Sequence, residues 1–153
     1  MFFLYVRIRD AYRELVRKSQ QWAKVKPVQE PEYDDSTDKF DLSIMDAIEQ
    51  LMQEKKPYQQ CALSIDSLAN LLGYKKHLVS EAINHCTKNN FNTFINEYRV
   101  KEAIRLLSDK NAKAESLDVV ASVAGFNNRI SFHHVFKKIT GLSPAEFRKN
   151  VID

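Results

Sequence analysis

The same pattern occurs twice in this chain of 153 residues, first in IDSLANLLGYKKHLVSEAI at 65–83 and again in LDVVASVAGFNNRISFHHVF at 117–136. In each stretch, apolar residues recur at steps of three or four on both sides of a glycine, Gly73 or Gly125. This spacing lines one face of a helix with apolar side chains, and glycine readily adopts the positive φ at which helices end. Each stretch therefore predicts two short helices joined by a tight turn.

The two stretches match position by position, with an offset of 52 before the turn and 53 after it. The matching pairs are Ile65 with Leu117, Asp66 with Asp118, Leu68 with Val120, Ala69 with Ala121, Gly73 with Gly125, Tyr74 with Phe126, Val79 with Phe132, Ala82 with Val135 and Ile83 with Phe136. In the second helix of each stretch, the face opposite these apolar positions is polar. A tight turn followed by such a helix is typical of a helix-turn-helix.

Further helices are predicted before and between the repeats. Apolar residues at helical spacing indicate one helix over about 41–55, which ends before Pro57. The same spacing indicates a longer helix from about Asn90 to Ser108. At ~1.5 Å per residue this helix is about 28 Å long, enough to hold two small units at a fixed separation.

A capping box marks the last predicted helix. Gly141 ends the helix before it, and Ser143, Pro144 and Glu146 take its N-cap, N1 and N3 positions. We therefore predict an all-α fold in which a long central helix bridges two helix-turn-helix subdomains. A basic N-terminal helix precedes them.

The charges are sorted along the chain. The net charge of +3 divides into +5 over residues 1–26, −6 over residues 27–60 and +4 over residues 61–153. The basic ends would attract a polyanion and the acidic middle would repel it. The two cysteines, Cys61 and Cys86, are too few for a disulfide framework, so a reducing compartment, by default the cytoplasm, is expected.

Neither a cofactor nor a metal ion is predicted. The four histidines and two cysteines lack the spacing of zinc ligands. Cys86 falls on the apolar stripe of its helix, where we expect it to be buried and inert. The sequence contains no glycine-rich phosphate loop and no nucleophile elbow, so it does not predict an enzyme.

Residues 1–26 are predicted to form a basic amphipathic helix. The apolar start at 1–6 is far shorter than the roughly 20 residues that span a bilayer, and Arg7 follows directly. Three interpretations stay open: a helix that packs on a partner or on a second copy of the chain, a juxtamembrane helix next to a membrane segment absent from this chain, and a second nucleic-acid arm. Residues 27–40, rich in Pro and acidic side chains, predict an extended linker.

The second repeat and the residues after it contain a distinctive series of motifs. These are Gly125-Phe126-Asn127, Ser131-Phe132, Phe136-Lys137-Lys138, Gly141-Leu142-Ser143-Pro144 and Phe147-Arg148. Through them, residues 41–150 resemble the DNA-binding domain of the AraC/XylS family of bacterial transcription regulators. The resemblance implies seven helices, entry into two successive major-groove segments on one face of DNA, and RNA polymerase as a partner. Tyr5-Val6-Arg7-Ile8-Arg9 also resembles the region after the membrane helix of membrane-bound sensory members, which implies a membrane tether upstream.

Side chains of the two second helices that lie off the apolar stripe are predicted to contact DNA. Such residues reach base edges, while Lys, Asn and helix N-termini meet phosphates. The predicted residues are Lys75, Lys76, His77, Ser80, Glu81 and Asn84 in the first unit, and Asn127, Asn128, Arg129, Ile130, His133, His134, Lys137 and Lys138 in the second. Arg129 is the strongest single candidate, because a guanidinium grips guanine O6 and N7 together. Since many family members carry Arg where Glu81 and His134 stand here, a different sequence preference is expected.

These features predict a sequence-specific DNA-binding transcription regulator, the cytoplasmic output part of a sensor. Its expected partners are double-stranded DNA and RNA polymerase, and a homodimer through residues 1–26 is one arrangement. The prediction requires both polar faces to point the same way, about one duplex repeat (~34 Å) apart. Glu81 and the acidic segment 27–60 leave one alternative, a non-enzymatic helical interaction module that has lost DNA binding.

Overall fold

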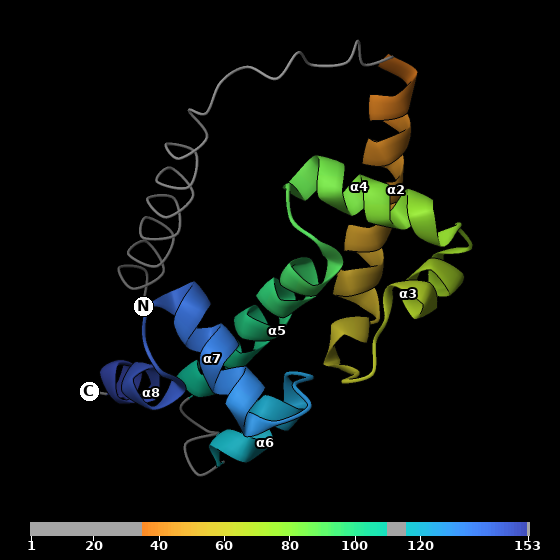
Figure 1. The fold of residues 1–153 in the computed structure, drawn as a ribbon. Helices are drawn as coiled ribbons and strands as arrows, with labels where there is room; N and C mark the ends of the chain where they lie inside the picture. The colour runs from red at the N-terminus through yellow and green to blue at the C-terminus, as the bar shows by residue number, and fades with distance from the viewer. Residues whose placement is uncertain (1–34, 110–115, 153) are drawn as a thin grey trace. The chain divides into compact units, whose positions relative to one another are not determined.

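The regular structure of the described residues is entirely helical (Figure 1). The computed structural model describes residues 35–109 and 116–152, so the predicted helix at 1–26 lies outside the described part. The elements are α2 (Asp35–Glu54), the short 3₁₀ helix η1 (Pro57–Gln59), α3 (Ile65–Leu72), α4 (Lys76–Thr87), α5 (Phe91–Ser108), α6 (Leu117–Val123), α7 (Arg129–Thr140) and α8 (Pro144–Ile152). Seven α-helices are thus described, and the all-α prediction is confirmed.

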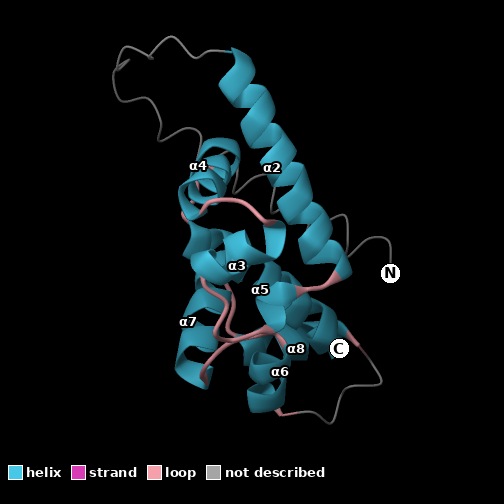
Figure 2. Cartoon of the chain, turned by 90° about the vertical axis from the view of Figure 1, so that its right-hand side faces the viewer, coloured by secondary structure: helices cyan, strands magenta, loops and turns pink. Residues whose placement is uncertain are grey.

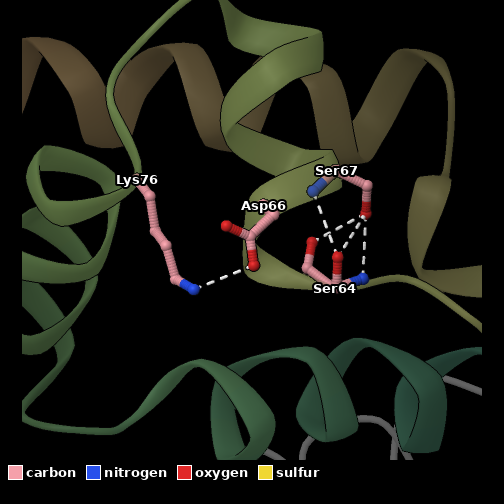
Figure 3. A network of polar contacts seen from close by, with 4 residues as sticks. All are labelled: Ser64, Asp66, Ser67 and Lys76. Atoms are coloured by element: carbon pink, nitrogen blue, oxygen red, sulfur yellow. Dashed lines mark hydrogen bonds and ion pairs between the residues drawn. The ribbon is translucent and has the colours of Figure 1, made fainter.

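Helix α3 begins and ends, α7 ends and α8 begins at the caps expected from the sequence. The N–H of Ser67 donates to Ser64 Oγ at 3.1 Å and the N–H of Ser64 donates to Ser67 Oγ at 2.9 Å, which closes a capping box at the start of α3 (Figure 3). Gly73 ends α3 with φ 74°. At the start of α8, the N–H of Ser143 donates to Glu146 Oε2 at 2.7 Å and the N–H of Glu146 donates to Ser143 Oγ at 3.3 Å.

The structure differs from the sequence expectation at two places. Helix α2 begins at Asp35 rather than near 41, so residues 35–40 of the predicted linker are helical. Residues 35–40 contain one apolar residue, Phe40, so apolar periodicity could not place the start of this helix. The expectation that Cys86 is buried is wrong: its side chain is exposed at the last turn of α4.

Each half of the described fold buries its own apolar core. The first core joins α2, η1, α3 and α4, and includes Ile83; the second joins α6, α7 and α8, and includes Phe136. Helix α5 belongs to both, because Phe94 packs in the first core and Val100, less than two turns later, in the second. The long central helix therefore bridges the two units as predicted.

Arg99 of α5 connects the two halves directly. Its Nε donates to the carbonyl oxygen of Tyr58 at 2.8 Å and its Nη2 donates to that of Gln60 at 3.0 Å, both in the loop around η1. The same guanidinium lies 6.0 Å from the centroid of the Phe126 ring, in the second half. Gly125 approaches this loop so closely that a Cβ there would overlap the Tyr58 carbonyl. The backbone of the second turn thus packs against the backbone of the first half.

Helices α4 and α7 lie on the same side of the described fold. In Figure 1 both pass in front of their neighbours, α2 and α5, and both run from right to left; in Figure 2, seen from the right-hand side, both lie at the left. Helix α4 is fixed to α2 by His85 Nδ1, which lies 3.2 Å from Oδ2 of the buried Asp41. Among the described helices, none combines the length and the apolar character needed to span a membrane.

Candidate nucleic-acid interface

An ion pair at equivalent positions joins the two helices of each helix-turn-helix unit. Lys76, the first residue of α4, places Nζ 2.9 Å from Oδ2 of Asp66 in α3 (Figure 3). Arg129, the first residue of α7, places Nη1 3.5 Å from Oδ2 of Asp118 in α6. All four side chains are exposed, so each pair contributes little to stability, on the order of 0–1 kcal/mol. Its effect is to orient a cation at the start of each second helix.

The outer face of α4 presents polar side chains with little net charge. All the first-unit residues predicted to contact DNA are exposed except Ser80, which is half-buried. Ser80 and Asn84 line a groove of about 430 Å³ together with Asn90, Phe91 and Asn92 at the start of α5. Leu63 and Ile65 also line it, so the groove combines apolar groups with amide and hydroxyl groups that donate and accept hydrogen bonds.

The outer face of α7 carries cations near both ends of the helix, Arg129 at the start and Lys137 and Lys138 near the end. A shallow hollow of about 650 Å³ is lined by Arg129, Ile130, His133, His134, Lys137 and Lys138. The structure thus brings together six of the eight residues predicted in the second unit. The other two precede the helix: Asn127 is exposed, and Asn128 is the N-cap, whose Oδ1 accepts from the N–H of Ser131 at 2.8 Å.

The two faces differ in charge. Helix α4 carries Lys76 and an exposed carboxylate, Glu81, whereas α7 carries three cations and no carboxylate. Glu146 of α8 lies near the C-terminal part of α7. Its hydrogen bonds with Ser143 lower the pKa of this carboxyl, and the charges of Lys137 and His133 add to the effect. It therefore stays ionised at neutral pH and limits the positive potential at that end.

Sequence reasoning missed the residues that position these faces. Asp66 and Asp118 were recognised as a matching pair of the repeat, but their ion pairs with Lys76 and Arg129 were not predicted. The signal was available, because an acidic residue in the first turn of one helix and a basic residue at the start of the next recur in both units. Arg99 carried no such signal, since its partners are backbone carbonyls about 40 residues away. The described residues contain no cluster of three or more His, Cys, Asp or Glu suited to hold a metal ion.

Two helix-turn-helix units that share one central helix define a double helix-turn-helix domain. A family model described as a helix-turn-helix domain matches residues 68–150, more than half of the chain. The chain belongs to the AraC-type helix-turn-helix family.

Two relatives show the extent of the sequence similarity. The chain is 34% identical over 88 residues to the uncharacterized HTH-type transcriptional regulator YisR of Bacillus subtilis. The matching region covers 58% of this chain and 30% of YisR. It is 32% identical over 91 residues to the probable transcription factor PqrA of Proteus vulgaris, which covers 58% of this chain and 70% of PqrA. The similarity to YisR thus spans less than a third of that protein.

Solved structures share the fold. An AraC-type transcriptional regulator from Chromobacterium violaceum superposes with a TM-score of 0.61 at 17% identity, over 72% of this chain and 93% of that one. The DNA-binding domain of AdpA, solved in complex with a target DNA, superposes with a TM-score of 0.59 at 20% identity, over 70% and 90%. At these identities the likeness establishes the fold.

Proposed function

We propose that this chain binds DNA sequence-specifically and regulates transcription, with α4 and α7 inserted into two successive major-groove segments. One observation carries the proposal: α4 and α7, the second helices of the two units, lie on one side of the fold (Figures 1 and 2). Most of their side chains that lie off the apolar stripe are polar and exposed. In a helix-turn-helix, the second helix is the one that enters the major groove. Membership of the AraC-type family supports the assignment. The DNA-binding domain of AdpA, which was solved in complex with a target DNA, shares this fold.

The two units contribute differently to the proposed binding. The cations of α7 supply most of the attraction to phosphates, because this helix has no carboxylate of its own. Helix α4 offers amide, hydroxyl, imidazole and carboxylate groups, which suit base edges better than phosphates. We therefore expect affinity and its salt dependence to reside mainly in the second unit.

The proposal is tested by titrating labelled duplexes, first selected from random DNA, into the protein and measuring fluorescence anisotropy. Lys137→Glu should weaken binding about tenfold and reduce the slope of log K against log salt by about 1 or more. The control is Lys55→Glu, an equal charge change at an exposed residue after α2. That end of α2 lies across the fold from α4 and α7 in Figure 2, so it should change affinity less than twofold. A protein that binds no duplex above random DNA at low salt would contradict the proposal.

For the whole protein we propose a non-enzymatic, cytoplasmic regulator that acts together with RNA polymerase. For residues 1–26 we propose a dimer-forming helix, with a membrane tether upstream of the chain and a second nucleic-acid arm as the two alternatives. Two domains held together gain affinity through their effective concentration. Sedimentation equilibrium of the full chain tests the dimer, and a monomer at micromolar concentration would contradict it.

A second candidate function is favoured by one feature, the exposed carboxylate of Glu81 on α4. Such a charge repels phosphates and suits a helical module that binds another protein. The two functions differ in their response to charge reversal at Arg129 and Lys137. A DNA-binding protein loses DNA affinity on this change, whereas a module that binds only proteins has none to lose.

A further inference from the structure

Ile130 is the most exposed of the large hydrophobic side chains in the described residues, with 83% of its surface accessible. It is the second residue of α7, in the turn of the helix that approaches base edges in a helix-turn-helix. Single apolar side chains are common on protein surfaces, so exposure alone does not distinguish Ile130. Its place does, because it lies at the start of α7 among the side chains that line the hollow on the outer face.

Ile130 has no part in either apolar core. The buried residues of α7 are Phe132 and Phe136, and a residue two positions before Phe132 points to the opposite side of the helix. Ile130 lies instead in the hollow of the outer face, with Arg129 beside it and His133 and His134 one turn further on. It is an apolar group surrounded by cations and hydrogen-bonding groups.

The first unit has a different residue at this place. With the offset of 53 that relates the second helices, Ile130 matches His77 of α4, which is also exposed. The core positions of the two helices match in apolar character, whereas this outward position does not. The apolar group is thus a property of the second unit alone.

We propose, on the basis of the proposed function, that Ile130 contacts the C5-methyl group of a thymine in the half-site read by α7. In the major groove that methyl is the one apolar group on a base edge, since cytosine, adenine and guanine offer only donors and acceptors beside their ring carbons. The cationic side chains around Ile130 hold the phosphate backbone, and the isoleucine selects thymine over cytosine. The half-site read by α4 has no such requirement.

The test replaces single thymines of the selected duplex by deoxyuridine, which removes only the methyl group. In fluorescence-anisotropy titrations, one thymine of the α7 half-site should show a loss of affinity of about threefold to tenfold, in line with one buried methyl and its contacts. Ile130→Ala should bind thymine and uracil duplexes equally well. Leu71→Ala removes another exposed large side chain, on α3, and should keep the full sensitivity to deoxyuridine.

Two further duplexes carry cytosine or 5-methylcytosine at the position of that thymine. The 5-methylcytosine duplex restores the methyl group without restoring thymine. It should recover part of the affinity with the wild-type chain and none with Ile130→Ala. If no deoxyuridine substitution in the α7 half-site weakens binding while the selected duplex still outcompetes random DNA, the inference is wrong and the proposed function stands. A selection that enriches no site overturns the proposed function and this inference with it.

Discussion

Replacing Gly125 by alanine should destabilise the protein far more than the same change at its counterpart, Gly73. Both glycines have positive φ, 93° and 74°, where an L side chain costs roughly 1–2 kcal/mol. A Cβ at position 73 meets no atom within 4 Å. A Cβ at position 125 would overlap the carbonyl oxygen of Tyr58 and lie 2.8 Å from Cα of Gln59. Both obstacles are backbone atoms, so a main-chain segment must move.

The expected magnitude follows from adding these effects. Overpacking costs about 1–3 kcal/mol beyond the cost of the positive φ, so Gly125→Ala should lower the free energy of unfolding by about 2–5 kcal/mol. Moving Tyr58 also disturbs the hydrogen bond that Arg99 Nε donates to its carbonyl. Gly73→Ala should lower the free energy of unfolding by only about 1–2 kcal/mol.

Urea denaturation followed by circular dichroism measures both variants against the wild type, with unchanged m values as the check on two-state unfolding. Gly141→Ala is a second control, since its φ is 80° and its Cβ also meets open space. If all three variants lost the same stability within about 0.5 kcal/mol, the close contact between the two halves would not exist as described.

Three further predictions concern polar residues. Arg99→Ala should lower the free energy of unfolding by about 1.5–3 kcal/mol, because two backbone carbonyls lose a charged hydrogen-bond donor. Lys76→Ala, which removes the exposed ion pair with Asp66, is the comparison. A smaller loss for Arg99→Ala than for Lys76→Ala would contradict the prediction. The hydrogen bonds from Arg105 lower the pKa of the buried Glu102 carboxyl in the folded chain. The stability that the ionised carboxylate contributes is therefore complete above the ordinary carboxyl pKa near 4.3, and it is lost as the pH falls through the lower pKa of the folded chain. In urea titrations, the stability advantage of the wild type over Glu102→Gln should shrink below about pH 4.5. Asp118→Asn removes a negative charge beside Arg129. It should tighten DNA binding a few-fold, while the free energy of unfolding changes by less than about 1 kcal/mol. Weaker binding in anisotropy titrations would show instead that Asp118 positions the Arg129 guanidinium.

The sequence predicted those parts of the fold that depend on local interactions. Ser64, Gly73 and Gly141 fix helix ends through hydrogen bonds and backbone angles within a few residues, so the ends were found. Cys86 was misplaced because periodicity gives the side of a helix but not whether the neighbouring element covers its last turn. Arg99 resembled an ordinary surface residue of a helix, because nothing in spacing reveals a contact with a distant loop.

The exposed residues of α4 and α7 could be predicted because they are the positions left over once the apolar residues of each helix are assigned to the core. That reasoning gives the members of each face but not their relations, and the pairs of Lys76 with Asp66 and of Arg129 with Asp118 needed coordinates. Whether a given side chain reads a base or meets a phosphate still depends on the position of a duplex, so the individual contacts stay predictions.

The repeat preserves what each half needs to fold and varies what faces outward. Each unit must bury its own core, so Val79 and Phe132 keep their apolar character at matching positions. On the outer faces the matching residues differ in chemistry, as with Glu81 and His134. Since α5 and Arg99 hold the two halves together, both faces would meet DNA in one fixed relation. A chain built in this way is suited to two half-sites of different sequence at a set spacing. A direct repeat of one half-site sequence would match the side chains of one helix face and not those of the other.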